Sequence, residues 1–149
     1  MNHQVNIWNP RARFAYELTG KYVAGMQLTG TEIKSIRWNK ADIKSAFCQF
    51  KNGEIYLINM FIAPYESGSY YNHEPRRARK LLLNKRELKK LEAHARVVGH
   101  AIIPTRVFLS DRGIAKVAIS LAKGRKLRDK RQYVREREDK RDLKRISKY

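Results

Sequence analysis

The chain has 149 residues, and its 33 Lys and Arg against 14 Asp and Glu leave a formal net charge of +19. With 42% hydrophobic and 10% aromatic residues it is too apolar for wholesale disorder, and it is long enough for one domain with a real core. Its apolar runs fall far short of the roughly 20 residues of a membrane-spanning helix, and residues 1–10 lack the apolar segment of a secretory signal. We therefore expect a cytoplasmic protein.

The first predicted elements are a strand and a short helix. Residues 16–28 are strand-like but contain Gly20 and Gly25, and glycine inside a strand indicates a bulge or a close approach of neighbouring groups. Thr29 and Glu32 have the spacing of a capping box, which predicts that a helix begins there.

A β-hairpin is predicted next. Two strand-like runs, residues 42–50 and 55–63, flank the dipeptide Asn52-Gly53, which is typical of two-residue hairpin turns. Residues 64–75 are rich in Tyr, Ser, Gly and Asn and predict a long loop.

The second half of the sequence contains the patterns of one short strand, one helix and two longer strands. Residues 80–83 form a short, mostly apolar run, and Asn84 with Glu87 predicts the start of a helix that stops near Gly99. Strands at 101–109 and 114–122 flank a turn. In the second of these, apolar side chains (Val117, Ile119, Leu121) alternate with Lys116, Ala118 and Ser120, which predicts one buried face and an outward Lys116.

Together these elements predict a mainly β fold. About six short antiparallel strands without βαβ order favour a small closed or partly closed barrel of the oligonucleotide-binding (OB) type, with two or three packed helices. We expect a body at residues 1–122, of which the first ten or so are flexible, and a basic tail at 123–149.

The tail is the most charged part of the chain. Residues 123–149 hold 13 of the basic and 5 of the acidic residues, a net +8, which leaves +11 on the body. Their few large apolar residues cannot form a continuous stripe, so the tail should be disordered when free and helical against a polyanion. Phosphate is the usual partner for such charge, and the missing apolar face favours nucleic acid over a membrane.

Catalytic motifs are absent from the sequence. The four histidines lack metal-ligand spacing, the single cysteine, Cys48, is best explained as a small buried residue, and no phosphate loop or nucleophile elbow occurs. We therefore expect no metal, no cofactor and no enzyme activity. Carboxylates brought together from distant positions would escape this search, so an RNA-processing enzyme stays an alternative.

Six sequence motifs, read in order, resemble the SsrA-binding protein (SmpB) family. They are residues 30–37, 51–54, 62–66, 72–77 and 79–87, and Gly124-Arg125-Lys126 with Asp129-Lys130-Arg131. The resemblance runs from about Asn9 into the tail. It implies a six-stranded antiparallel OB-type barrel and a non-enzymatic role in trans-translation, the rescue of stalled bacterial ribosomes.

The resemblance also implies partners. The family binds the tRNA-like domain of transfer-messenger RNA (tmRNA), and the complex is delivered to the ribosome with elongation factor Tu. The protein body then stands where an anticodon arm would be, and the tail enters the empty mRNA channel beside the decoding centre of the small subunit. A ribosomal or ribosome-assembly protein with the same barrel and tail is the alternative.

Site residues follow from the resemblance. The tmRNA-binding positions it implies are Tyr16, Glu32, Lys34, Leu82, Asn84 and Lys116. Structural roles compete at three of them, because Leu82 could be a core residue and Asn84 and Glu32 could be helix caps. The ribosome-binding positions are Arg125, Lys126, Arg128, Asp129, Lys130 and Arg131.

Two positions depart from the family pattern. Val23 stands where many relatives carry an acidic residue, so no polar RNA contact is expected there. Arg128 stands where His or Tyr is common, and its guanidinium could stack on a base in their place.

Overall fold

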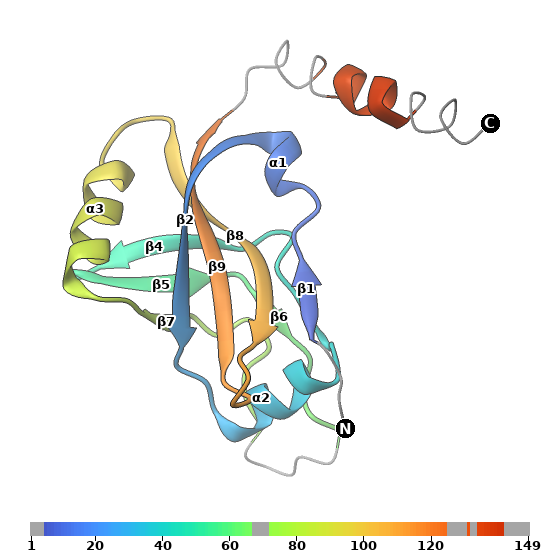
Figure 1. Ribbon diagram of the computed structural model, residues 1–149. Coiled ribbons are helices and arrows are strands. Elements are labelled where there is room, and N and C mark those ends of the chain that lie inside the picture. The colour runs from blue at the N-terminus through green and yellow to red at the C-terminus, as the bar shows by residue number, and fades with distance from the viewer. Residues whose placement is uncertain (1–4, 67–71, 125–130, 132–133, 142–149) are drawn as a thin grey trace.

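The computed structural model of the protein describes residues 5–66, 72–124, 131 and 134–141 (Figure 1). In chain order, its elements are β1 (Asn6–Trp8), α1 (Ala12–Ala15), β2 (Tyr16–Met26), α2 (Gly30–Arg37), β3 (Ala41–Asp42), β4 (Phe47–Lys51), β5 (Glu54–Ile58), β6 (Phe61–Ile62), β7 (Arg79–Leu82), α3 (Lys85–Ala95), β8 (His100–Leu109) and β9 (Ala115–Gly124). None of the helices in these residues is both long and apolar enough to span a bilayer.

The fold is mainly β, with antiparallel sheet and several helices. One seven-stranded sheet has the order β1-β8-β9-β2-β7-β5-β4, and β3 pairs with β6 separately. Every pairing is antiparallel, and the longest are those of β9 with β2 and with β8. Strand β9 lies between β8 and β2, and it carries one of the predicted site residues, Lys116.

The large sheet is strongly curled. In Figure 1, β4 and β5 run across the direction of β2, β8 and β9, and the edge strand β4 contacts β8. Two bulges add to this curvature, because β9 changes register against β2 around Gly20 and against β8 around Thr105. Gly20 has φ 65, a conformation that glycine adopts at little cost.

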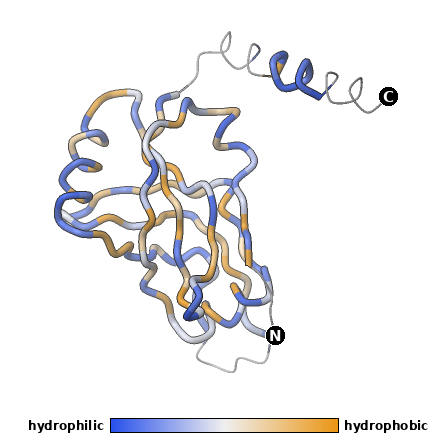
Figure 2. The backbone as a smooth tube through the Cα atoms, viewed as in Figure 1, coloured by the Kyte–Doolittle hydropathy of each residue, from blue (hydrophilic) through white to orange (hydrophobic). Residues whose placement is uncertain are grey.

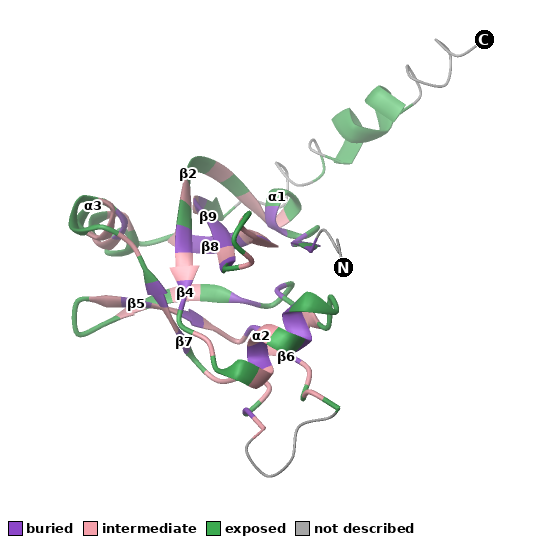
Figure 3. Ribbon diagram, turned by 60° about the horizontal axis from the view of Figure 1, so that its bottom comes forward, coloured by how far each residue is buried: buried purple, intermediate pink, exposed green. Residues whose placement is uncertain are grey.

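The core lies inside the curled sheet. Its fully buried side chains include Ile55, Leu57, Ile62, Leu91, Ile102, Val107, Val117 and Ile119. Figure 2 shows apolar segments along these strands, and Figure 3 shows buried residues on α2 and on the strands that it meets. Burial of this apolar surface is the main force that holds α2 and α3 against the sheet.

The predicted helix starts and the hairpin turn are confirmed. Both Thr29 with Glu32 and Asn84 with Glu87 form complete capping boxes. Asn52 and Gly53 have φ values of 53 and 78 and join β4 to β5 in the register Lys51↔Glu54. These features depend on neighbours within a few residues, which is why local sequence predicts them.

The strand count differs from the prediction. We expected six strands in a barrel and a flexible stretch over about the first ten residues, whereas the sheet has seven strands and Asn6–Trp8 pairs with β8. Its hydrogen-bonded pairing is also not closed into a ring, since β1 and β4 are its two edges. A three-residue strand is too short to show an alternating pattern, and α1, with four residues, is too short to show a helical one.

Longer predicted strands are interrupted. The predicted strand at 55–63 is divided into β5 and β6 by Asn59, whose φ of 64 turns the chain, and residues 42–50 are divided between β3 and β4. A positive φ at a non-glycine residue leaves little mark on the sequence, although Asn is among the residues that tolerate it best.

The boundary between body and tail also shifts. β9 extends to Gly124, because Lys123 pairs with Glu17 and Gly124 with Tyr16, so two residues assigned to the tail belong to the sheet. Arg131 and residues 134–141 are helical and exposed. Disorder of the free tail, and its helical state on the ribosome, stay predictions.

Candidate nucleic-acid interface

Leu82, Gly25 and Lys116 form one row across three strands. Gly25 of β2 is paired with Leu82 of β7 on one side and with Lys116 of β9 on the other. A Cβ placed on Gly25 would lie 3.5 Å from Leu82 Cβ and 3.8 Å from Lys116 Nζ, so these two side chains meet above the glycine. Leu82 is 53% exposed. Since it lies outside the core, the alternative of Leu82 as a core residue is not supported.

An aromatic and cationic cluster continues this row. Phe108 of β8 is paired with Lys116, and the Arg106 guanidinium lies 4.6 Å from the Phe108 ring centroid and 5.2 Å from that of Trp8. Asn6 Oδ1 accepts a hydrogen bond from Arg106 Nε at 2.7 Å. The surface therefore combines cations with aromatic rings, of which Trp8 is exposed, and this combination suits nucleic acid.

Asn84 lies two residues beyond Leu82. Its Oδ1 accepts a hydrogen bond from the Glu87 backbone N–H at 2.9 Å, and Glu87 accepts one from the Asn84 N–H, so the side chain caps α3. The residue is exposed, and the hydrogen bonds found among the described residues do not use its amide NH₂ group. One side chain can therefore cap the helix and present a donor outwards.

Tyr16 is separated from these residues. It begins β2 opposite Gly124, nine residues from Gly25, which in an extended strand is roughly 30 Å. The side chain is half-buried and lines a groove with Arg13 and Leu18. Tyr16 thus lies at the end of the body from which the tail departs.

Glu32 is not at the surface, and its predicted direct contact with RNA is wrong. The residue is fully buried, and its carboxylate is paired with Arg79, which is also fully buried, and with Arg77 at 2.6 Å. It also accepts the Thr29 backbone N–H at 2.9 Å. The capping alternative holds, because a side chain without exposed surface cannot touch an external ligand.

The electrostatics of Glu32 favour its charged form. Burial alone would raise the pKa of Glu32, but the hydrogen bonds from Arg77, the Thr29 N–H and Arg79, together with the Arg79 charge, lower it below the ordinary value of 4.5. Arg79 also donates to the carbonyl oxygens of Met60 at 2.7 Å and Pro75 at 3.1 Å. This cluster fastens α2 to β7 and to the end of the loop that precedes β7.

The other predicted positions are placed as follows. Lys34 is exposed on α2, with its Nζ 5.4 Å from the centroid of the Tyr65 ring. Arg131 is exposed, whereas Arg125, Lys126, Arg128, Asp129 and Lys130 lie outside the described residues. The structure therefore unites Leu82 and Lys116, with Asn84 nearby in the chain.

Groups suited to metal binding do not gather in the described part of the chain. Within residues 5–66, 72–124, 131 and 134–141 there is no set of three His, Cys, Asp or Glu able to hold a metal ion. Cys48 is half-buried, and its burial raises the pKa of the thiol.

Comparison with known proteins decides the family. A family model described as SmpB protein matches residues 6–149. The chain belongs to the SmpB family. The match includes β1, the whole curled sheet and the basic tail, so both parts of the chain are family features.

Curated relatives and a solved structure agree with SmpB membership. The SsrA-binding protein of Christiangramia forsetii is 52% identical over 148 residues, covering 99% of this chain and 94% of the relative. That of Flavobacterium psychrophilum is 53% identical over 144 residues, covering 97% and 96%. A chain of the structure called "tmRNA-SmpB: a journey to the center of the bacterial ribosome" is 46% identical, with a TM-score of 0.70 over 83% of this chain and 86% of that one.

Three residues of the aromatic and cationic cluster were not among the positions predicted from the sequence. Trp8, Arg106 and Phe108 come from strands 100 residues apart, and only the pairing of β1 with β8 brings them together. The one sequence signal was Arg106, a charged residue inside the mostly apolar run of β8, which marks an outward-facing position.

Proposed function

We propose that the chain binds the tRNA-like domain of tmRNA and delivers it to stalled ribosomes for trans-translation. The observation that carries this proposal is the family match over residues 6–149, supported by curated relatives at about 50% identity. The solved structure that it resembles is named for tmRNA, SmpB and the bacterial ribosome. A cytoplasmic location follows, because ribosomes work there.

The mechanism relies on shape and charge. The body takes the place of an anticodon arm, and the tail occupies the empty mRNA channel, with Arg125, Lys126, Arg128, Asp129, Lys130 and Arg131 against ribosomal RNA. Elongation factor Tu joins the delivery complex, and the protein itself makes and breaks no bond. We further propose that the curled sheet acts as an OB-type barrel, since β4 contacts β8 across the interior.

A competition assay tests the proposal. Labelled tRNA-like domain of tmRNA is bound to the full chain and displaced by unlabelled elongator tRNA or by a ribosomal RNA helix. We expect both competitors to be weaker than the unlabelled tRNA-like domain. Equal displacement by the ribosomal helix would favour the alternative, a ribosomal or ribosome-assembly protein, and RNA turnover during the assay would favour an RNA-processing enzyme.

Lys116→Ala should weaken tmRNA binding without unfolding the protein. Lys116 meets Leu82 above Gly25, so its ammonium is placed for a phosphate of RNA lying on that row. The slope of log affinity against log salt should fall by roughly 0.7 to 0.9, the contribution of one phosphate contact. Both quantities come from fluorescence-anisotropy titrations at several salt concentrations.

The matched control removes the same charge elsewhere. Lys51 is exposed at the hairpin end of β4, three strands from β2 in the sheet order. Lys51→Ala should change neither affinity nor slope beyond the small effect of one surface charge. Similar losses in both variants would mean that binding depends on net charge and that Lys116 has no special position.

Asn84→Asp separates capping from RNA contact. Asp caps a helix about as well as Asn, so the free energy of unfolding should stay the same, measured by urea titration. Affinity for the tRNA-like domain should fall on the order of tenfold, because a carboxylate replaces the amide donor and repels phosphate. Asn84→Ala, in contrast, should also lose about 1 kcal/mol of stability. Wild-type affinity in Asn84→Asp would assign Asn84 to capping alone.

A further inference from the structure

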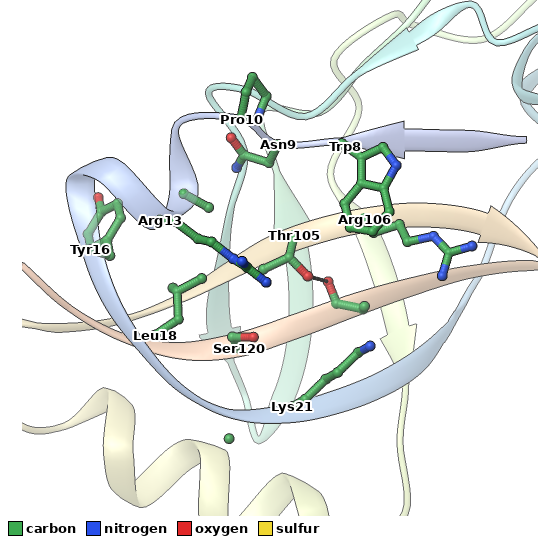
Figure 4. A pocket seen from close by; sticks show the side chains of 13 residues that line it. Trp8, Asn9, Pro10, Arg13, Tyr16, Leu18, Lys21, Thr105, Arg106 and Ser120 are labelled. Carbon is green, nitrogen blue, oxygen red and sulfur yellow. Dashed lines mark hydrogen bonds between the residues drawn. The ribbon is translucent and has the colours of Figure 1, made fainter. Parts of the chain in front are cut away.

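A groove on the outer face of the sheet has a role still to be assigned. The segment from β1 through α1 to β2 crosses over β8 and β9, which lie between those two strands in the sheet. The space beneath it has a volume of about 1010 Å³ (Figure 4). The lining residues come from β1, α1, β2, β8 and β9 and from the link between β1 and α1. They are Trp8, Asn9, Pro10, Ala12, Arg13, Tyr16, Leu18, Gly20, Lys21, Thr105, Arg106, Ala118 and Ser120.

The charge of the groove is of one sign. Arg13, Lys21 and Arg106 line it from three different elements, and its lining includes no Asp or Glu. Figure 4 shows the side chains of Arg13 and Lys21 extending toward the space over β9. Lys21 is exposed and takes part in no ion pair found within the described ranges. The groove therefore attracts anions.

The rim of the groove carries a fixed aromatic ring. Trp8 is 60% exposed, and the Arg106 guanidinium lies 5.2 Å from the centroid of its ring and 4.6 Å from that of the Phe108 ring. Asn6 Oδ1 accepts the Arg106 Nε–H at 2.7 Å and holds the guanidinium in place. Trp8 thus presents a supported flat surface that the core does not use.

Both bulges of the sheet lie in the floor of the groove. Gly20 and Thr105 line it, and each marks a change of register against β9. Thr105 Oγ1 donates to the Ala118 carbonyl oxygen at 3.2 Å, which fixes the second bulge. Bulges are common beside binding sites because they redirect side chains and bend a strand. Small residues between them keep the floor open.

We propose that this groove binds one unpaired nucleotide of the RNA, with its base stacked on Trp8 and its phosphate between Arg13 and Lys21. The inference rests on the proposed function and extends its RNA surface beyond the row of Leu82, Gly25 and Lys116. An unpaired base is required because paired bases inside a duplex expose no ring face for stacking. The volume of about 1010 Å³ is just above the range for small-molecule sites, roughly 300–1,000 Å³, so the groove has room for a nucleotide.

Tryptophan fluorescence tests the stacking directly. The chain has two tryptophans, so Trp38→Phe leaves Trp8 as the only one in an otherwise full-length protein. Octa-adenylate at low salt should quench Trp8 emission, and a fully paired, blunt-ended RNA duplex of eight base pairs should quench it much less at the same nucleotide concentration. Equal quenching by the duplex, or none by octa-adenylate, would overturn the proposal.

Affinity for the tRNA-like domain of tmRNA provides the second test. Trp8→Leu should weaken binding roughly 5- to 150-fold, the range for loss of one stacked base, and Trp8→Phe should restore most of it. Lys21→Gln should lower the salt slope by roughly 0.7 to 0.9, whereas the controls Trp38→Leu and Lys51→Gln should leave affinity and slope unchanged.

The outcomes separate this inference from the proposed function. Wild-type affinity in Trp8→Leu and Lys21→Gln, with a loss in Lys116→Ala, would overturn the nucleotide groove and leave the tmRNA-binding function standing. A wild-type protein without preference for the tRNA-like domain would overturn the proposed function itself.

Discussion

Truncation after Gly124 should leave tmRNA binding close to wild type and abolish peptide tagging of stalled chains. Gly124 is the last residue of β9 and is paired with Tyr16, so the whole sheet is retained. The deletion removes 12 basic and 5 acidic residues and leaves a net charge of +12 from the original +19, so the body stays strongly cationic. Every proposed ribosome contact of the tail is lost.

Two assays check this result. Binding of the tRNA-like domain is measured by anisotropy, and tagging is measured in reconstituted translation of a message without a stop codon. A fall in RNA affinity of tenfold or more would show that the tail belongs to the tmRNA site, and efficient tagging by the truncated chain would remove the tail from the mechanism.

Two further variants show whether the end of β9 is needed for stability, and whether the tail acts through its charge or through the order of its residues. A truncation after Ala122 also removes Lys123 and Gly124, which pair with Glu17 and Tyr16, so it should lower the thermal midpoint where the longer fragment does not. A full-length chain with residues 125–149 in scrambled order keeps the composition and should still fail to tag. Tagging by the scrambled chain would reduce the role of the tail to its charge.

Local signals predicted much of the fold. The two capping boxes and the Asn52-Gly53 turn each depend on residues within four positions, and all three are present. The alternation in β9 was only partly right. Val117 and Ile119 are buried as predicted, but Ala118 and Ser120 are buried too, at the floor of the groove whose other lining residues come from β1, α1, β2 and β8. Neighbours from distant parts of the chain leave no mark on the sequence of the strand that they surround.

The candidate site was harder to predict, because its chemistry depends on contacts between distant residues. Glu32 and Arg79 are 47 residues apart, and a motif rich in basic residues suggests an exposed Arg79, whereas the side chain is fully buried. Asn6 and Arg106 are 100 residues apart, and their contact supports Trp8. The resemblance to the SmpB family supplied Leu82 and Lys116 as contacts, and the β-sheet register shows that they are neighbours.

Glu32→Gln should lower the free energy of unfolding by about 3–5 kcal/mol, the usual cost of removing one partner from a buried ion pair. The amide leaves the fully buried Arg79 without a counter-charge and weakens the bond from Arg77. Because Arg79 also holds the carbonyls of Met60 and Pro75, the loss extends to the contact between α2 and the end of the loop before β7. Urea unfolding at pH 7 measures the change.

Control variants show whether burial is the cause. Glu66→Gln breaks the Lys40–Glu66 pair at 2.8 Å, but that carboxylate is 82% exposed, so it should cost at most about 1 kcal/mol. If Glu66→Gln and Glu32→Gln lowered the free energy of unfolding equally, burial of the Glu32 ion pair would not be the cause of the loss. Folded Glu32→Gln should bind the tRNA-like domain with wild-type affinity, because Glu32 has no exposed surface.

The same variant should also change the dependence of stability on pH. Since the native pKa of Glu32 is lowered, its stabilising contribution is complete above the ordinary value of 4.5 and is lost as pH falls through that value toward the lower native pKa. Wild type should therefore lose stability in acid more steeply than Glu32→Gln, and the two curves should converge as Glu32 becomes protonated in the native state. Parallel curves from neutral pH to pH 3 would show that Glu32 is not a titrating support of the fold, and the buried cluster would then have to be held by Arg79 and its carbonyl acceptors alone.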